Sequence, residues 1–257
     1  MQTFVEPVEA DQAALDRIED AAASLAERYL SSATQTGLAR AQAAEALDGL
    51  VRQATGLAKA ASVAGFVRLL VESGERVLLY GWHHSVYDAW IRGLFGLRVV
   101  KFTGEETSVE KAKAAADFIN GKLDVLIMSL RSGAGLDGLQ EASSVLVFGE
   151  LDWSPGVHEQ CIGRLARDGQ GKSVLAYYLV TDQGSDPIIL DVLGVKREQV
   201  EGINDPKGAV LHVVQSDVSR MRKLAESYVK NHAPARTAAA PVLVADDVEN
   251  DLAVVDF

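Results

Sequence analysis

Two arginines, Arg164 and Arg167, are the residues of this sequence best suited to phosphate chemistry. They lie in Val157–Arg167, a segment whose spacing predicts a helix that also carries Gln160. Side chains three positions apart lie on one face of a helix, so both guanidinium groups would point the same way. Because a guanidinium presents a fixed fork of donors to phosphate oxygens, this spacing predicts a face that binds a polyanion.

Two apolar runs and a glycine-rich loop must position this face. Val125–Leu130 and Val145–Phe148 are bounded by turn residues, which is typical of buried strands. The glycine-rich loop Ser132–Gly138 separates them, and the turn Asp152–Gly156 leads into the segment with the arginines. We interpret the rest of the chain as support for this stretch.

Further apolar runs alternate with helical patterns through the middle of the chain. Continuous apolar strands that alternate with helices are typical of a parallel sheet covered on both faces, so we expect an α/β core. The other expected elements are the strands Arg76–Tyr80, Val99–Phe102 and Ser173–Val180, the helix Ser85–Leu94, and the helix Val109–Asn120 capped by Ser108.

Helical patterns flank this core on both sides. Residues 1–9 are expected to be irregular, and three amphipathic helices are expected between them and residue 73. The expected organisation is therefore a helical N-terminal extension or connector at 1–73, an α/β domain at 74–203, a packing helix at 204–232 and a flexible acidic tail at 233–257.

Composition excludes several classes of protein. With a net charge of -11 over 257 residues, the chain is not a generic polyanion binder, and nucleic-acid contact would need a local basic face. The single cysteine, Cys161, excludes an internal disulfide framework and a cysteine-cluster metal site, so no metal ligands are assigned. No apolar run approaches the ~20 residues of a membrane span. The first residues do not match a signal peptide, so we expect a cytoplasmic protein.

Two familiar motifs match the sequence but fail on the order of elements. Gly133–Gly138 fits the dinucleotide pattern G-x-G-x-x-G, but the next strand begins at Val145 and leaves no room for the crossover helix. Ala166–Ser173 fits a relaxed phosphate-loop pattern, but it follows a helix and precedes a strand, which reverses the order that the mechanism needs. We reject both assignments.

The remaining motifs resemble a known family when they are taken together. These motifs are Val77–His84 (VLLYGWHH), Thr103-Gly104, Ser129–Leu139 (SLRSGAGLDGL), Asp152–Pro155 (DWSP) and Glu159–Gln170 (E-Q-x-x-x-R-x-x-R-x-G-Q). In order and spacing they strongly resemble the second RecA-like lobe of superfamily 2 helicases, most closely the SNF2-type DNA translocases. The resemblance implies a RecA-like parallel sheet with helices on both faces, with the helical N-terminal extension and a C-terminal helix added.

The resemblance also implies roles for individual residues. Arg167 would be the finger on the γ-phosphate of ATP, with Arg164 close to it. Three further residues would lie on the nucleotide side: Gln160, Gly135 and Asp137, the last near the ribose or the lobe interface. Contacts to the nucleic-acid strand would come from Thr103, Gly104, Ser129, Ser132 and Gly133.

The chain departs from the family in one major respect, because it has neither a phosphate loop in the right context nor an acidic box. ATP and its Mg²⁺ would therefore be held mainly by an N-terminal RecA-like lobe, in the same longer chain or a separate one. The sequence predicts that this chain alone is inactive and that, with that lobe, it forms an ATP-dependent motor on DNA or RNA. The alternatives are a non-catalytic lobe that binds DNA or protein as an adaptor, and a nucleotide-sugar transferase with a similar C-terminal lobe.

Overall fold

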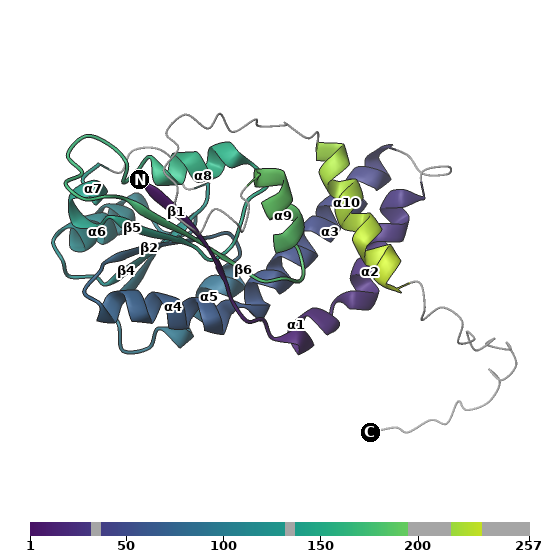
Figure 1. Ribbon diagram of the computed structural model, residues 1–257, viewed down its shortest axis with the longest axis horizontal. Helices are drawn as coiled ribbons and strands as arrows, with labels where there is room; N and C mark the ends of the chain where they lie inside the picture. Colours follow the sequence, from purple (N-terminus) through teal and green to yellow (C-terminus); the bar gives the residue numbers. More distant parts are fainter. Residues whose placement is uncertain (32–36, 132–136, 195–216, 233–257) are drawn as a thin grey trace, which may run out of the picture.

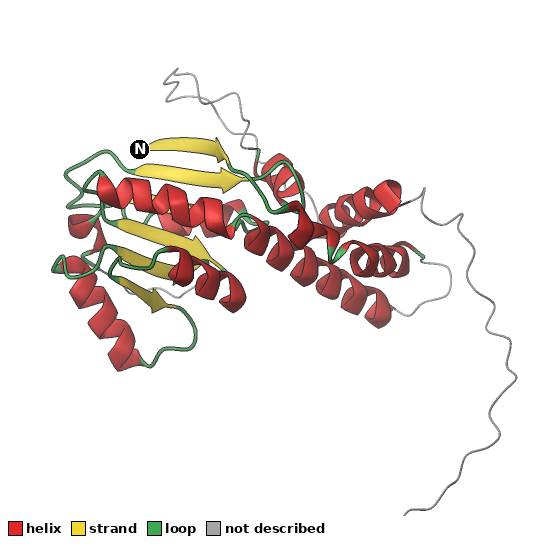
Figure 2. Ribbon diagram, turned by 90° about the horizontal axis from the view of Figure 1, so that it is seen from below, coloured by secondary structure: helices red, strands yellow, loops and turns green. Residues whose placement is uncertain are grey.

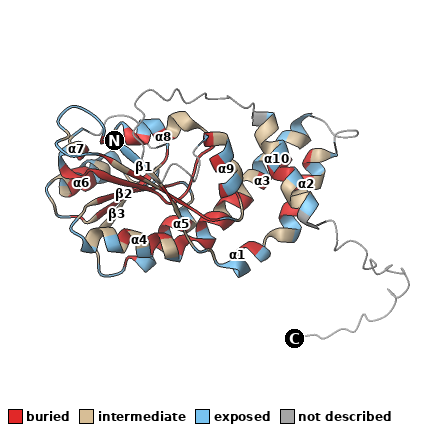
Figure 3. Cartoon of the chain, viewed as in Figure 1, coloured by how far each residue is buried: buried red, intermediate tan, exposed pale blue. Residues whose placement is uncertain are grey.

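A parallel β-sheet lies at the centre of the computed structural model, which describes residues 1–31, 37–131, 137–194 and 217–232. Within these residues the sheet has six strands in the order β1-β6-β5-β2-β4-β3, and every neighbouring pair is parallel. The strands are β1 Gln2–Pro7, β2 Val77–Gly81, β3 Val99–Phe102, β4 Val125–Ser129, β5 Val145–Phe148 and β6 Leu175–Val180. The central strands β2 and β5 are buried along their whole length, which explains why their sequences are continuously apolar (Figure 3).

Helices cover both faces of the sheet, as the sequence predicts (Figure 1). Side chains at alternate strand positions pack on α4 and α5 on one face, and on α6, α7 and α8 on the other. The helices are α1 Gln12–Asp16, α2 Glu19–Leu30, α3 Gly37–Ala58, α4 Ala60–Glu72, α5 His84–Gly93, α6 Ser108–Ile119, α7 Leu139–Ala142, α8 Pro155–Ile162, α9 Asp186–Leu193 and α10 Asp217–His232.

Helices α2, α3 and α10 form a separate group that projects beyond one end of the sheet (Figures 1 and 2). The Tyr29 hydroxyl of α2 donates a hydrogen bond to the Val218 carbonyl of α10 at 3.1 Å. Leu224 of α10 is fully buried in the core that these helices share with the sheet. Among the described residues no single helix is long and apolar enough to cross a membrane, and α3 and α4 pass that test only as a pair bent by 52°.

The expectation of irregular residues 1–9 is wrong, because Gln2–Pro7 forms the edge strand β1. This strand pairs with β6 from Gln2 opposite Leu175 to Pro7 opposite Val180. Phe4 stacks on Tyr177 of β6, with 5.1 Å between the ring centroids. A six-residue run of polar and apolar residues is a weak signal by itself, and its pairing with β6 stabilises it as a strand.

The helix after β5 is shorter than predicted. The sequence predicts Val157–Arg167, whereas α8 ends at Ile162 and the chain continues in turns. Glycine in a helix interior costs up to about 1 kcal/mol relative to alanine, and Gly163 is the residue where the helix stops. The amide of Arg164 bonds to the Cys161 carbonyl, which is one residue too close for an α-helix. Arg164 and Arg167 therefore do not share a helix face.

Candidate functional site

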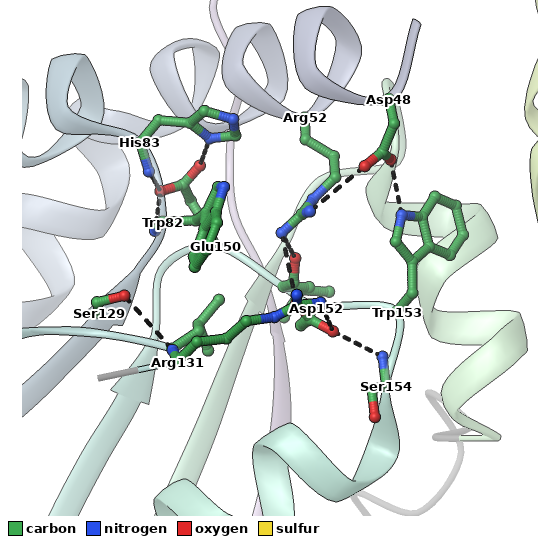
Figure 4. Close-up of polar contacts among 12 residues, drawn as sticks. Asp48, Arg52, Trp82, His83, Ser129, Arg131, Glu150, Asp152, Trp153 and Ser154 are labelled. Carbon is green, nitrogen blue, oxygen red and sulfur yellow. Dashed lines mark hydrogen bonds and ion pairs between the residues drawn. The ribbon is translucent and has the colours of Figure 1, made fainter. Parts of the chain in front are cut away.

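The carboxyl ends of the parallel strands place several polar side chains along one edge of the sheet. Trp82 and His83 follow β2, Arg131 follows β4, and Glu150 and Asp152 follow β5. These three strands are neighbours in the sheet, in the order β5-β2-β4. Figure 4 shows the resulting polar network, which helix α3 approaches from one side. We call this set of residues the carboxyl edge.

Asp152 is the centre of this network. Its side chain is 1% exposed, and its two oxygens accept hydrogen bonds from the Ser154 amide at 2.9 Å and from Arg131 Nη2 at 3.1 Å. A second guanidinium, that of Arg52, lies 4.0 Å from the same carboxylate. A buried carboxylate is stable when it is paired and hydrogen-bonded, so Asp152 fixes the position of both arginines. Arg131 remains 58% exposed, and it presents an anchored positive charge at the surface.

Helix α3 is hydrogen-bonded to the turn after β5. Arg52 Nη2 donates to the Leu151 carbonyl at 2.8 Å, and Trp153 Nε1 donates to Asp48 Oδ1 at 2.7 Å. Asp48 also accepts from Arg52 Nη1 at 3.5 Å. These bonds hold Trp153 in the interface between α3 and the sheet, where the residue is only 8% exposed. The helical group and the carboxyl edge are thus one connected structure.

Glu150 anchors the chain after β2. Its Oε2 accepts hydrogen bonds from the amides of Trp82 at 2.7 Å and His83 at 3.0 Å, and its Oε1 lies 2.6 Å from His83 Nδ1. Glu150 is 4% exposed, so these groups supply the polar contacts that a buried carboxylate needs. The main chain at the end of β2 is held in one conformation as a result.

His158 at the start of α8 is a buried, neutral imidazole. Its Nδ1 lies 3.1 Å from the Ser154 carbonyl, and its Nε2 accepts from the Asp152 amide at 3.4 Å. These partners require a proton on Nδ1 and none on Nε2. Burial lowers the pKa of His158 to about 4, which the neighbouring Ser154 carbonyl and Asp152 only partly oppose. His158 therefore stabilises the turn and does not act as a charged ligand at neutral pH.

A cavity of about 480 Å³ opens beside Arg131, between α3, α10 and the turn after β5. Its walls carry both signs of charge as well as apolar groups. The lining residues are Ala44, Glu45, Asp48, Arg131, Asp152, Trp153, Ser154, Arg220 and Met221.

The predicted phosphate-binding residue Arg167 lies near the amino ends of the strands, across the sheet from the carboxyl edge. Helix α8 leads back from the carboxyl edge, and Gln170 Nε2 donates to the carbonyl of Ser143, just before β5 begins. Arg167 Nη1 forms an ion pair with Asp137 Oδ1 at 2.7 Å. The two side chains are 41% and 85% exposed, so the structure brings these predicted nucleotide-side residues together at the surface.

Arg164 and Gln160 have different surroundings from Arg167. Arg164 is half-buried, and its charge lies close enough to Cys161 to oppose the effect of burial, which raises the pKa of that thiol to about 12. A thiol of this kind is unreactive at neutral pH, and Cys161 packs as a small apolar residue. Gln160 is exposed on α8. Of the predicted nucleotide-side residues, Gly135 lies outside the described residues.

The predicted nucleic-acid contacts are only partly accessible. The Thr103 side chain is buried, and its hydroxyl donates to Glu106 at 2.9 Å, whereas Gly104 is exposed. Partial burial acts to raise the pKa of Glu106, but the hydrogen bonds from Thr103 outweigh it and the pKa falls. Ser129 is half-buried at the end of β4, and Ser132 and Gly133 lie outside the described residues. Gly104 follows β3 and Ser129 ends β4, so both lie at the same end of the sheet as the carboxyl edge.

Sequence reasoning missed Arg131, Glu150 and Trp82. The signal was present, because each of the three follows a predicted strand, and polar groups after parallel strands gather at one edge. It was ambiguous, because single charged residues after strands are common at protein surfaces. The partners that distinguish these residues, Asp152 for Arg131 and the Trp82 amide for Glu150, lie 21 and 68 positions away in the sequence.

Comparisons with known proteins show a family match and several similar relatives. Residues 59–169 match the family described as the helicase conserved C-terminal domain. A Drosophila melanogaster protein, SWI/SNF-related matrix-associated actin-dependent regulator of chromatin subfamily A-like protein 1, is 30% identical over a match of 146 residues that covers 54% of this chain. The chain spans only 19% of that relative's length.

Two solved structures have a similar fold. The C-terminal part of the Fun30 ATPase domain has a TM-score of 0.59 and 12% identity, covering 91% of this chain and 98% of that one. The Sulfolobus solfataricus SWI2/SNF2 ATPase core, solved in complex with dsDNA, has a TM-score of 0.61 and 15% identity, covering 76% of this chain and 44% of that one. The predicted RecA-like parallel sheet is confirmed.

Proposed function

We propose that the C-terminal lobe of an SNF2-type helicase, which this chain contains, completes the ATP-hydrolysing site of a DNA translocase whose first RecA-like lobe binds the nucleotide. In this proposal ATP is the substrate, and its Mg²⁺ is bound by the first lobe. The contribution of this chain is positive charge at the γ-phosphate and a surface for DNA. Neither lobe hydrolyses ATP without the other.

The observation that carries the proposal is the exposed ion pair between Arg167 and Asp137. Arg167 keeps 41% of its side chain accessible, and its partner carboxylate is 85% exposed. An exposed ion pair contributes only ~0–1 kcal/mol, so a phosphate of higher charge can displace Asp137 at little cost. A guanidinium placed on the γ-phosphate oxygens stabilises the charge of the transition state and raises kcat by roughly 10³–10⁵-fold.

The carboxyl edge supports the DNA-binding part of the proposal. Arg131 presents an anchored positive charge there, Ser129 ends β4, and Gly104 follows the neighbouring strand β3. Phosphate contacts of this kind position a duplex without reading its sequence. A translocase needs such contacts because it moves along DNA of any sequence. The net charge of -11 confines this binding to a local surface.

Steady-state ATP hydrolysis by the two-lobed motor, with and without duplex DNA, tests the proposal. Arg167→Ala is expected to lower kcat by about 10³-fold or more, with a smaller change in KM for ATP. Arg222→Ala is the matched control, because Arg222 is also an exposed arginine with an exposed carboxylate partner, Glu226 at 2.7 Å. That control is expected to leave kcat unchanged.

The outcomes separate the finger assignment from the alternatives. An Arg167→Ala motor with kcat within twofold of the wild type would refute the finger role. DNA binding that persists while neither arginine affects turnover would favour the adaptor lobe. Circular dichroism of each variant confirms that a loss of turnover is not a loss of fold.

A further inference from the structure

Trp82 is an exposed aromatic residue on the carboxyl edge. It follows β2 directly, and 38% of its surface is accessible. The chain has three tryptophans, and the other two, Trp90 and Trp153, are 0% and 8% exposed. The accessible indole of Trp82 lies beside the predicted nucleic-acid contacts, where an aromatic face can stack with a base.

The position of Trp82 is fixed by buried groups. Its amide donates to Glu150 Oε2 at 2.7 Å, and the next amide, of His83, donates to the same oxygen at 3.0 Å. Glu150 is itself buried and also contacts His83 Nδ1 at 2.6 Å. The backbone that carries the indole is therefore held before any ligand arrives.

Arg131 holds the indole from the neighbouring strand. Strands β2 and β4 are in parallel register, with Gly81 opposite Ser129, so the residues after their ends meet. The Arg131 guanidinium carbon lies 5.4 Å from the centroid of the Trp82 ring, and Asp152 anchors the other side of that guanidinium (Figure 4). A cation at this distance from an indole is attracted to its face.

We propose that Trp82 is a stacking platform for an unpaired base in a single-stranded stretch of the bound DNA. The proposal rests on the proposed DNA-binding function of this lobe and adds a contact that does not depend on phosphate charge. Every base has an aromatic face, so an indole can stack with any base and suits a protein that moves along DNA. The Arg131 cation beside the ring favours a polyanion at this place over an apolar protein segment.

DNA binding to the whole chain, measured by anisotropy of fluorescein-labelled DNA at about 50 mM salt, tests the platform. The probes are a dT oligomer of about 16 nucleotides and a duplex with a single-stranded tail. Trp82→Ala is expected to weaken binding roughly 5- to 150-fold, while Trp82→Phe retains most of the affinity because it keeps an aromatic ring. The dependence of affinity on salt is expected to stay the same in both variants, because no phosphate contact is removed.

Phe95→Ala is the matched control. Phe95 is an exposed aromatic residue, 87% accessible, but it follows α5 and lies at the far end of that helix from Trp82. Its loss is expected to leave DNA affinity unchanged. Intrinsic fluorescence gives a second measurement, because Trp82 is the exposed tryptophan: DNA is expected to quench it and to shield it from acrylamide, and Trp82→Phe is expected to abolish both effects.

The two proposals fail in different ways. If the wild-type chain and its two-lobed motor bind neither probe, both the DNA-binding function and the platform are wrong. If the wild type binds DNA and Trp82→Ala binds as tightly as Phe95→Ala, only the platform is wrong, including the case in which Trp82 serves a protein partner. A Trp82→Ala variant with a lowered melting temperature is judged by Trp82→Phe and by acrylamide shielding of the wild type.

Discussion

Replacing Lys59 with methionine is expected to destabilise the fold strongly, although lysine is usually a surface residue. Lys59 lies between α3 and α4 and is 0% exposed. Its ammonium donates to Asp186 Oδ2 at 2.7 Å and to the Leu179 carbonyl at 2.6 Å. Asp186 is 2% exposed, and the same oxygen accepts from the Thr181 amide at 3.0 Å. This buried pair joins the helical group to the end of β6 and the start of α9.

The loss of stability expected for Lys59→Met follows from the groups that the substitution leaves unpaired. Lys59→Met keeps most of the side-chain volume but leaves the Asp186 carboxylate buried, with the Thr181 amide as its one remaining hydrogen-bond donor among the described residues. Breaking a buried ion pair by removing one partner costs about 3–5 kcal/mol, out of a total stability of about 5–15 kcal/mol for a typical domain. Urea unfolding at pH 7, followed by circular dichroism and by the fluorescence of the buried Trp90, measures the change.

Two controls make this prediction specific. Lys223→Met removes an ion pair of similar length, 2.8 Å to Asp191, whose side chains are 44% and 65% exposed, and is expected to cost no more than ~1 kcal/mol. The double variant Lys59→Met with Asp186→Asn is expected to lose much less than the sum of its single variants, because no buried charge remains unpaired.

The effect of pH provides an independent check on the Lys59 prediction. Burial raises the pKa of Asp186, and the Lys59 ammonium opposes that rise. Without Lys59 the pKa of Asp186 rises further, so the folded variant takes up a proton more readily than the unfolded chain as the pH falls. Its deficit in stability therefore shrinks on acidification. Equal losses for Lys59→Met and Lys223→Met, or a deficit that grows on acidification, would refute the reasoning.

Two further predictions concern the core. His158 has a pKa of about 4 in the folded state and near 6.5 when unfolded, so its contribution to stability is complete above pH 6.5 and falls by up to ~3 kcal/mol towards pH 4. Urea titrations of the wild type and of His158→Asn across this range measure the loss as a change in their difference in stability. A difference that stays constant with pH contradicts the prediction. A Cβ at Gly81 would lie 2.5 Å from Trp90, so Gly81→Ala is expected to cost about 1–3 kcal/mol of stability. A Cβ at Gly65 would have no atom within 4 Å, so Gly65→Ala is expected to stabilise α4 by ~0.5–1 kcal/mol. Melting temperatures of the two variants that shift in the same direction would contradict this contrast.

The strands of the core were predictable because their signal is local. Val125–Leu130 and Val145–Phe148 are continuously apolar, and the structure buries β4 and β5 between two layers of helices. The helix expected at Val109–Asn120 was also predictable, although its cap was misplaced by one residue. Thr107, not Ser108, accepts from the Glu110 amide, and the Glu110 side chain bonds back to Thr107. The Thr-x-x-Glu spacing of this capping box was present in the sequence.

Elements that depend on distant partners were missed or misjudged. Strand β1 gains its stability from β6, more than 160 positions away, so its own residues carry little signal. The helix with the arginines was extended past Gly163 because apolar periodicity alone does not mark its end. Helix α9 was not predicted. Its first residue, Asp186, is held by an ion pair with Lys59, which lies 127 positions earlier in the sequence.

The sequence by itself determined the order of the strands β2 to β6 and of the helices α5, α6 and α8 between them, the motifs of the family, and the residue types available for phosphate and DNA. These follow from periodicity and turn chemistry, which act over a few residues. Only the tertiary structure decided which charges are buried and which lie at the surface. It pairs Arg167 with Asp137 at the surface, anchors Arg131 on Asp152 beside Trp82, and encloses Lys59. The physical reason is that the cost of a charge depends on its burial and partners, which are set by elements far apart in the sequence.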